Sequence, residues 1–351
     1  TMKIRISHKV AITTFLTAGA GVLVFAFLSY IDVSSYFTQN LLSSLSQSVK
    51  SDSNEIKSSI KGIKNDILSL SKNESISGMI RADKNKFKYD SKENATYSDW
   101  INRFRKVISV VLEQNENYYQ VRFIGFKNNG KELINAIGRN NSVYFKKDKE
   151  LQSKFSRDYF KQTIKLKNGE VHISEINLNK EHGVIINPIF PTIRLSVPIY
   201  DDNKIYGILI INANTNQLFN LTRKDVLKDE HIYLVNKNGD YLYNRNSQKM
   251  FEFGKDFKIQ NDYDISVLMN TDMETISFYS INDLAVSARK IYLSKNDFII
   301  YIKTATNKFL NEQSLKYKKQ ITVYIMVIIL FIVLFTAIIT RYLTAPIVML
   351  T

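Results

Sequence analysis

Two long apolar runs without a charged residue stand near the two ends of the chain. They cover residues 10–31 and 321–340. A helix of about 20 apolar residues is long enough to cross the hydrocarbon core of a bilayer. A cleavable signal peptide would have a shorter apolar stretch followed by small residues, whereas Asp32 and Tyr36 follow the first run. The pattern therefore predicts two transmembrane helices, one at each run.

Basic residues precede the first apolar run, because residues 1–9 contain two lysines and an arginine. Positively charged flanks stay on the cytoplasmic side of a membrane, so we expect residues 1–9 inside the cell. Long connecting segments cross the membrane largely regardless of charge, so the lysines before the second run do not oppose this orientation. The prediction is a two-pass protein of the cell (inner) membrane, with residues 32–320 extracytoplasmic or periplasmic.

The first periodic stretch between the two runs is helical. Apolar residues recur there at alternating spacings of four and three residues, which is the a/d seam of a coiled coil. The seam consists of Ile56, Ile60, Ile63, Ile67 and Leu70. We predict a long stalk helix over residues 32–84 that continues the first transmembrane helix. The seam has two candidate partners: a second subunit, which is our prediction and makes the protein a homodimer, or the remainder of the same domain.

Two groups of strands follow another helical pattern at residues 97–113, where Trp100, Phe104 and Ile108 share one face. Alternation of apolar and polar residues predicts the first group of strands. These strands cover residues 119–126, 132–138, 170–176, 192–200 and 206–212. The second group covers residues 231–235, 241–244, 277–279, 284–291 and 298–305. Turn signals such as Asn128-Asn129-Gly130 join neighbouring strands and indicate antiparallel pairing.

The fold class predicted by this order is α+β, in which helices cover antiparallel sheets. The first strand group belongs to a membrane-distal module at residues 85–220, called the distal module below. The second belongs to a membrane-proximal module at residues 221–306, called the proximal module. A basic connecting helix at residues 307–320 then leads into the second transmembrane helix, and residues 341–351 return to the cytoplasm.

Composition narrows the classes of function. The 351 residues carry a net charge of +15, but lysines are interspersed with Asp and Glu and form no block interleaved with aromatic residues. Binding of single-stranded nucleic acid requires such a block, so we predict no nucleic-acid partner. There is no cysteine, and His172 and His182 lack further ligands at metal-binding spacing, so we predict no metal and no cofactor. No nucleophile elbow, phosphate loop or paired-histidine motif occurs, which predicts that this segment is not an enzyme.

Three arginines of the distal module are candidates for binding an anion. The guanidinium group of Arg157 can hold a carboxylate through two hydrogen bonds, or it forms a structural salt bridge. Arg122 and Arg194 occupy alternating strand positions, so their side chains point away from their apolar neighbours, into a pocket or into solvent. Tyr159 and Phe160, which follow Arg157 closely, form either an aromatic lid or part of the core.

A polar loop contributes further candidates to the same region. Asn179, Glu181 and His182 precede a glycine, and a histidine beside a carboxylate is a candidate ligand-binding or pH-sensing group. Pro188 and Pro191 stiffen the chain after this loop, because the residue before a proline is restricted to extended geometry. The loop is therefore expected to form a wall of the pocket.

The order of transmembrane helix, stalk helix, two sheet modules and second transmembrane helix resembles the double-Cache (dCache, PAS-like) sensors of bacterial receptors. The likeness covers nearly the whole chain and is most specific in the distal module. It is carried there by Leu151-Gln152, Lys154, Arg157-Asp158-Tyr159-Phe160, Gly169-Glu170-Val171, Ser174, residues 178–183, Pro188, Pro191 and Arg194. In the proximal module, residues 233–242 look like the opening hairpin. Pro346-Ile347, followed by Leu350, resembles the start of a HAMP linker.

The resemblance implies a stalk helix followed by two PAS-like antiparallel-sheet Cache modules that sense a small molecule outside the cell. It also implies control of a cytoplasmic output, which is a histidine kinase, a diguanylate cyclase or a methyl-accepting chemotaxis region. Members that bind amino acids have an Arg followed by two aromatic residues, matched here by Arg157, Tyr159 and Phe160, although Tyr159 replaces the usual Trp. They also have an Asp that holds the ammonium group of the ligand.

Asn212 stands at the position of that Asp, and a neutral amide does not pair with an ammonium group as a carboxylate does. The expected ligand is a carboxylate, an amino acid or a similar small molecule. The predicted ligand-binding residues are Arg157, Tyr159, Phe160, Arg194, Asn212, Arg122, Ser174, Asn179, Glu181 and His182. Two other classes of function stay open on the sequence alone: a membrane-anchored module for adhesion or protein interaction, and a membrane-anchored hydrolase.

Overall fold

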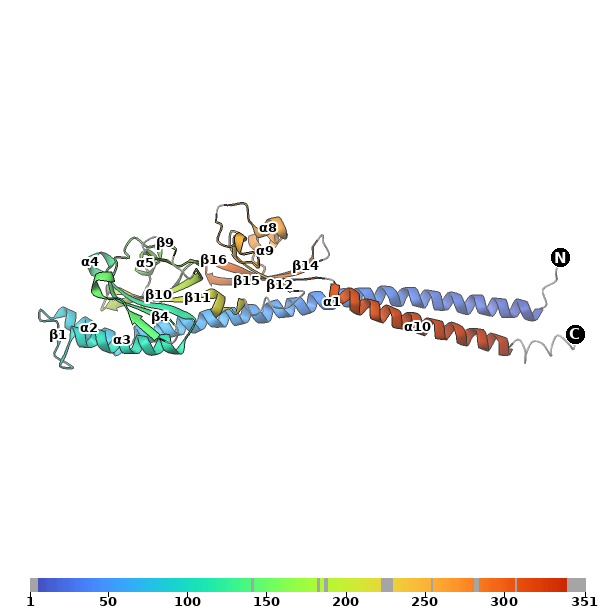
Figure 1. Cartoon of the computed structure of the whole chain (residues 1–351), viewed down its shortest axis with the longest axis horizontal. Coiled ribbons are helices and arrows are strands. Elements are labelled where there is room, and N and C mark those ends of the chain that lie inside the picture. The colour runs from blue at the N-terminus through green and yellow to red at the C-terminus, as the bar shows by residue number, and fades with distance from the viewer. Residues whose placement is uncertain are drawn as a thin grey trace. The chain divides into compact units, whose positions relative to one another are not determined.

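The structure of the protein is a computed structural model, and its elements are shown in Figure 1. It describes residues 6–139, 142–181, 184–185, 189–221, 230–253, 255–280, 284–306 and 308–339. The chain divides into two compact units. The first comprises Thr1–Leu45, Phe278–Val286 and Ala305–Thr351, and the second comprises Ser46–Ser277 and Ser287–Thr304. The HAMP-like connector at residues 341–351 lies outside the described residues.

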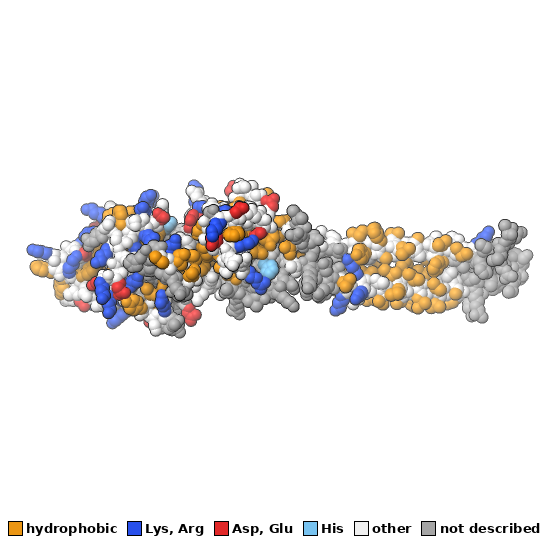
Figure 2. Space-filling model, turned by 45° about the horizontal axis from the view of Figure 1, so that its top comes forward, with side chains coloured by type: hydrophobic (Ala, Val, Ile, Leu, Met, Phe, Trp, Pro, Cys, Tyr) orange, Lys and Arg blue, Asp and Glu red, His pale blue; other side chains and the backbone are white. Residues whose placement is uncertain are grey.

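The first unit is dominated by two apolar helical segments. Helix α1 (Ile6–Ser71) reaches a mean hydropathy of 1.9 in its N-terminal part, and α10 (Lys308–Ile339) reaches 3.0. Neither apolar stretch is buried within the protein, and Figure 2 shows hydrophobic side chains covering this part of the surface. The Lys318 ammonium group lies 4.0 Å from the centre of the Tyr30 ring, where the two helices meet. By length and composition, both helices can cross a membrane.

The isoleucine seam of α1 is buried by its own chain. Ile56, Ile63 and Ile67 are fully buried in the main hydrophobic core, together with Trp100 and Phe104 of the helix that follows. The seam therefore does not supply the contact between subunits that we predicted for it. The physical reason is that a stripe at spacings of three and four fits any apolar surface, including one on the same domain.

The predicted stalk helix is also interrupted before residue 84. Helix α1 ends at Ser71, and α2 (Glu74–Lys84) begins after Asn73. The Asn73 side chain accepts a hydrogen bond from the Ser75 backbone N–H, as a helix N-cap does. A hydrogen bond of this kind starts a new helix, so the chain turns instead of continuing along α1.

The distal module contains an antiparallel sheet of seven strands, in the order β5-β4-β3-β11-β10-β6 with β7 also paired to β10. The strands are β3 (Tyr118–Gly125), β4 (Glu132–Arg139), β5 (Ser142–Phe145), β6 (His172–Ile173), β7 (Asn177–Leu178), β10 (Pro191–Asp201) and β11 (Lys204–Asn214). The short ribbons β1 (Tyr89–Asp90) with β2 (Ala95–Thr96) and β8 (Lys180–Glu181) with β9 (Val184–Ile185) lie outside it. The strand predicted at residues 170–176 pairs only briefly, because the Ser174 side chain, rather than a backbone carbonyl, accepts the Arg194 N–H.

The turn between β3 and β4 contains the Asn129-Gly130 pair that predicted it from the sequence. Asn129 and Gly130 have φ values of 57° and 68°, in the left-handed region that glycine and asparagine tolerate best. The short helix α4 (Lys127–Gly130) occupies this turn. The other short helical segments of the distal module are η1 (Asp148–Glu150), α5 (Asp158–Thr163) and α6 (Thr215–Leu218).

The two faces of the distal sheet differ in chemistry. Helix α3 (Tyr97–Gln114) begins at a capping box formed by Thr96 and Asp99, and it packs with α2 on one face (Figure 1). On β10, Ile193 and Leu195 point into this helix-covered core. The alternate residues of β10, Thr192, Arg194 and Ser196, point to the opposite face, which lies under α5 and the β6–β9 segment. That second face is buried and combines a small apolar cluster with a group of polar side chains, and the part that carries the polar side chains is called the polar face below.

The proximal module contains a sheet of five strands in the order β13-β12-β16-β15-β14. Its strands are β12 (Glu230–Asn236), β13 (Tyr241–Tyr243), β14 (Thr275–Tyr279), β15 (Ala285–Ser294) and β16 (Asp297–Ala305). The segment between β13 and β14 includes η2 (Ser247–Lys249), α8 (Ile259–Asp262) and α9 (Ser266–Asn270). The fold is thus a mixture of helices and antiparallel sheets preceded by a long helix, as the α+β prediction stated.

Candidate ligand-binding site

Four neighbouring strands bring polar side chains together on the second face of the distal sheet. Arg194 of β10 lies opposite Asn212 of β11, which in turn lies opposite Gln120 of β3. Two residues further along β3, Arg122 lies opposite Asn135 of β4. Because residues two apart in a strand share a face, all five side chains project from the same side of the sheet. The polar positions in these apolar strands were the sequence signal for this site.

Arg194 is buried, and its hydrogen-bond partners in the described part of the chain are neutral. It is 7% exposed, and Nη1 donates to Asn177 Oδ1 at 2.7 Å while Nη2 donates to Asn179 Oδ1 at 3.4 Å. Among the described residues, no carboxylate forms an ion pair with it. Burial lowers the pKa of Arg194 to about 10, and the nearby charges of Arg122 and Arg157 act in the same direction. Among the described residues, the hydrogen-bond partners of this buried positive charge are neutral amides.

Two buried groups beside Arg194 have hydrogen-bonding capacity that is not used. Asn179 is 4% exposed, and its Nδ2 has no partner among the described residues. Thr192, two residues before Arg194 on the same face of β10, is fully buried, and its hydroxyl has no partner there either. Buried polar groups are almost always hydrogen-bonded, so two unsatisfied donors next to a buried guanidinium indicate a site for an acceptor. Thr192 was not among the predicted residues.

Arg122 lies on the neighbouring part of this face. Its Nη1 donates to the Tyr159 hydroxyl at 3.1 Å, and its guanidinium carbon lies 5.2 Å from the centre of that ring. Its Nη2 donates to Asn212 Oδ1 at 3.3 Å, and Asn212 Nδ2 donates to Gln120 Oε1 at 2.9 Å. Arg122 also forms an ion pair with Glu132, at 3.6 Å. Both arginines predicted from alternation thus point into the buried region and not into solvent.

Glu132 supplies a buried carboxylate that sequence reasoning missed. Its side chain is fully buried, and Oε2 accepts hydrogen bonds from Asn135 Nδ2 and the Gln152 backbone N–H, both at 3.1 Å. The Lys154 ammonium group lies 4.0 Å from the other carboxylate oxygen, Oε1, which is within ion-pair distance. One sequence feature could have indicated Glu132: it is an acidic residue at the start of a predicted strand whose other residues are mostly apolar.

Helix α5 covers the polar face and separates the two aromatic candidates. Phe160 is fully buried in a small apolar cluster with Ile124, Ile208 and Ile210, so it belongs to the core. Tyr159 is half-buried and contacts Arg122, as described above. The Thr163 and Ser196 hydroxyls lie 2.5 Å apart and connect α5 to β10.

The remaining predicted residues take different places. Arg157 is half-buried at the N-cap of α5, where its side chain makes no capping hydrogen bond, and it is close enough to affect the pKa of Arg194. Ser174 accepts the Arg194 N–H at 3.0 Å and so positions the strand, not the guanidinium. The backbone of Glu181 lies in β8, while its side chain and the whole of His182 lie outside what the structure describes.

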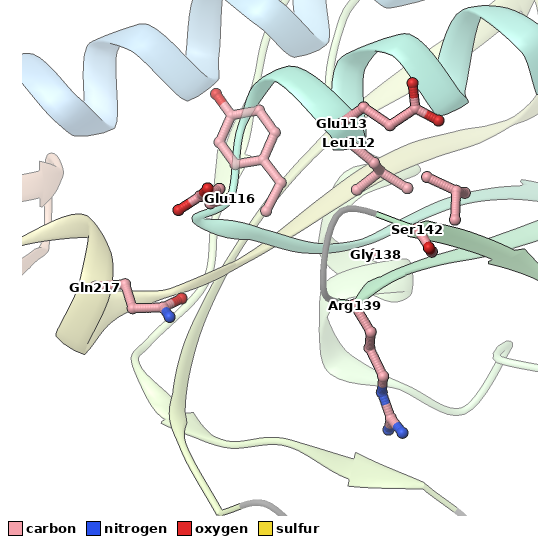
Figure 3. A pocket seen from close by; sticks show the side chains of 9 residues that line it. Leu112, Glu113, Glu116, Gly138, Arg139, Ser142 and Gln217 are labelled. Carbon is pink, nitrogen blue, oxygen red and sulfur yellow. The ribbon is translucent and has the colours of Figure 1, made fainter.

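A separate groove of about 300 Å³ lies where the end of α3 meets β3, β4, β5 and α6, as Figure 3 shows. Its charged lining residues are Glu113, Glu116 and Arg139, all exposed. None of the predicted site residues lines it. Within the described part of the chain, no group of three or more histidine and acidic side chains could hold a metal ion.

Comparison with known families gives the identity of the domain. The family described as "Bacterial histidine kinase, sensor domain" matches residues 69–269, which is more than half of the chain. The chain belongs to this family. The part of the chain that the family covers contains every residue of the polar face described above. It is a sensory region and not a catalytic one, as the sequence indicated.

Solved structures show the same fold for this sensor domain. The extracellular domain described for a histidine kinase, vpHK1S-Z8, has a TM-score of 0.65 and 18% identity, covering 80% of this chain and 96% of that one. A domain of a sensory box/GGDEF family protein from Vibrio parahaemolyticus has a TM-score of 0.64 and 19% identity, covering 78% and 98%. The ligand-binding domain of the Campylobacter jejuni chemoreceptor Tlp3, in complex with L-valine, has a TM-score of 0.53 and 14% identity, covering 79% and 97%. Among curated proteins, no sequence matches the chain significantly.

Proposed function

We propose that this sensor domain binds a small carboxylate-bearing molecule on the polar face of the distal sheet and thereby controls a cytoplasmic output. The observation that carries the proposal is the buried Arg194, whose hydrogen-bond partners among the described residues are neutral and which stands beside the unsatisfied donors of Asn179 and Thr192. A ligand carboxylate would supply the missing negative charge and accept from these donors. The solved Tlp3 domain, with the same fold, is in complex with L-valine, which also carries a carboxylate.

The energetics favour such a ligand. A buried charge without an ionic partner is costly, and the cost is recovered when a counter-charge arrives with good hydrogen-bond geometry. A guanidinium group offers two parallel N–H donors to a carboxylate, and each charge-assisted hydrogen bond is worth about 1.5–3 kcal/mol. Arg157, half-buried at the start of α5, would add a second guanidinium on the solvent side of the same site.

Entry of the ligand requires the cover of the site to move. Tyr159 of α5 contacts Arg122, and the Thr163–Ser196 contact joins α5 to the sheet. A molecule that replaces these contacts stabilises an arrangement in which α5 and the β6–β9 segment sit differently. A ligand shifts an equilibrium between two arrangements only by its difference in affinity for them. We propose that this difference reaches the output region through α1 and β16, which leads to α10.

The membrane topology and oligomeric state that we propose are those predicted from the sequence. The protein would be a two-pass protein of the cell (inner) membrane, with residues 32–320 on the periplasmic side. It would act as a homodimer, whose contact uses surfaces of α1 other than the buried seam. Signal transfer across the membrane would then be a relative movement of α1 and α10 in each subunit.

The test uses the full chain purified in detergent, with titration calorimetry against carboxylates, amino acids and amines. Arg194→Met and Arg157→Met should each weaken binding of a carboxylate by about tenfold or more, because each removes a charge-assisted contact. Arg103→Met, which removes an exposed arginine of α3, is the matched control and should leave the affinity unchanged. Carboxylate binding that survives the Arg157→Met/Arg194→Met double substitution would refute the proposed site.

A further inference from the structure

One short segment of the chain contacts both the candidate site and the proximal module. On the side of the site, Ser174 Oγ accepts the Arg194 backbone N–H at 3.0 Å. Asn177 and Asn179 accept hydrogen bonds from the Arg194 guanidinium group at 2.7 and 3.4 Å. The Ser174 hydroxyl also donates to the backbone carbonyl of the next residue, at 2.9 Å. Residues 174–179, called the bridging segment below, are therefore attached to Arg194 at three points.

The proximal module holds the same segment through Lys237. Glu175 Oε1 lies 3.2 Å from Lys237 Nζ, and Lys237 Nζ lies 3.4 Å from Asp297 Oδ1. Lys237 stands in the turn between β12 and β13, and Asp297 is the first residue of β16. All three belong to the same compact unit of the chain, and their ionic contact is called the module bridge below. The module bridge joins the bridging segment to the strand that precedes α10.

Lys237 makes this contact attractive. Burial raises the pKa of Asp297, the positive charge of Lys237 lowers it, and the negative charge of Glu175 raises it again. The two carboxylates are therefore close enough to repel each other, and Lys237 lies between them. Removing the charge of Lys237 would leave like charges facing each other on the bridging segment and on β16.

A ligand carboxylate competes with the bridging segment for Arg194. A carboxylate held through two parallel hydrogen bonds needs two donors of one guanidinium group, and Nη1 already donates to Asn177. An anionic acceptor forms a stronger hydrogen bond with a cation than a neutral amide does. A carboxylate at the two Nη nitrogens therefore replaces Asn177. The bridging segment then loses one attachment to β10, while the module bridge still holds it to β16.

From these contacts we propose that the module bridge opposes ligand binding, because it holds the bridging segment in the arrangement in which Asn177 occupies Arg194. Ligand binding in turn loosens the contact of this segment with β16. The inference rests on the proposed function, because it assumes that a carboxylate binds at Arg194. It goes further by assigning the link between the site and β16 to Glu175, Lys237 and Asp297. Linked equilibria are reciprocal, so a contact that the ligand weakens must itself weaken ligand binding.

Titration calorimetry on the full chain in detergent, with acetate, butanoate and L-valine as probes, measures this effect. Lys237→Met should raise the carboxylate affinity by about two- to fivefold, a modest factor because a partly exposed ion pair contributes little. Glu175→Gln should raise it by a similar factor. The Glu175→Gln/Lys237→Met double variant should gain no more than the single variants, because both substitutions remove the same contact.

Two further variants control for effects on charge and folding. Lys237→Arg keeps the positive charge between the two carboxylates and should bind within about twofold of the unmodified protein. Lys295→Met removes an exposed lysine two residues before Asp297 and should leave the affinity unchanged. Melting curves show which variants are folded.

Hydrogen exchange tests the reverse direction without any substitution. A saturating carboxylate should speed exchange of the backbone amides at residues 297–299 of the unmodified protein by about two- to fivefold, because it favours local opening at the start of β16. The same carboxylate should have no such effect in folded Lys237→Met, in which the module bridge is already absent.

The outcomes separate this inference from the proposed function. If a carboxylate binds, but Lys237→Met and Glu175→Gln leave its affinity unchanged or lower it, the inference is wrong while the carboxylate site remains. Additive effects of the two substitutions, or exchange at residues 297–299 that the carboxylate does not change, would also overturn it. If none of the three probes binds, the carboxylate site itself is refuted and the inference with it.

Discussion

Lys303 of β16 forms an ion pair with Asp52 of α1, with Nζ and Oδ2 3.0 Å apart. Lys303 is 4% exposed, and its ammonium group also lies 3.3 Å from Glu230 Oε2 and donates to Ser48 Oγ at 2.8 Å. The Tyr301 hydroxyl donates to the same Asp52 oxygen at 2.8 Å. The strand that precedes α10 is therefore joined to α1 by a buried ionic cluster and not by apolar packing alone.

Replacing Lys303 with methionine should destabilise the protein by about 2 kcal/mol, because it leaves two partly buried carboxylates without their cation. The value is below that of a fully buried pair, since the Asp52 and Glu230 side chains are 16% and 28% exposed. Chemical denaturation of the full chain in detergent measures the effect. The Lys303→Met/Asp52→Asn double variant should recover part of the loss. Additive losses would show that the two groups do not interact.

Gly78 of α2 should resist even the smallest enlargement. A Cβ at this position would lie far inside van der Waals contact with the ring of Trp100. Gly78→Ala should therefore lower the stability by about 1–3 kcal/mol, although alanine is the better helix former. Gly62→Ala in α1 is the matched control, because a Cβ there meets nothing within 4 Å, and it should raise the stability by up to about 1 kcal/mol. Melting curves of the two variants should move in opposite directions.

Removing the charge of Arg194 should stabilise the protein without ligand. Burial lowers the pKa of Arg194 because the folded state disfavours its charged form, so Arg194→Met relieves that cost. We expect a gain of about 1–3 kcal/mol, together with the loss of carboxylate binding. A combined gain in stability and loss of binding is typical of a residue kept for its function. A destabilised Arg194→Met would instead indicate a structural role.

The stability of the protein should fall as the pH drops through the range in which His172 titrates. Burial lowers the pKa of His172, and Asp297 opposes this only in part. The unfolded chain, with its ordinary pKa near 6.5, then binds a proton more readily than the folded protein. The contribution of His172 is therefore fully present above pH 6.5 and is lost as the pH falls through the lower pKa of the folded state.

His172→Gln should remove this part of the pH dependence, as measured by denaturation between pH 7.5 and pH about 5. Asp297→Asn should have the opposite effect, because it removes the charge that favours protonated His172. A slope that is the same in His172→Gln and in the unmodified protein would show that other groups cause the dependence.

Local patterns in the sequence determined which elements form and which face of each is apolar. Strict alternation predicted β3, β10 and β11 to within two residues at each end, because a strand exposes successive side chains to opposite faces. The same alternation placed Arg194 on the face away from Ile193 and Leu195, and Arg122 on the face away from its own apolar neighbours in β3. The isoleucine seam was equally visible as a helical stripe.

Only the tertiary structure decided what each face meets. The seam packs on its own sheet and helices, and Phe160 joins the core while Tyr159 contacts Arg122. Arg194 is buried against Asn177 and Asn179, which lie on a segment that precedes its own strand. The unsatisfied Asn179 and Thr192 could not be recognised before those segments were in place. Periodicity encodes the polarity of a surface, whereas burial and the balance of charge depend on contacts between residues far apart in sequence.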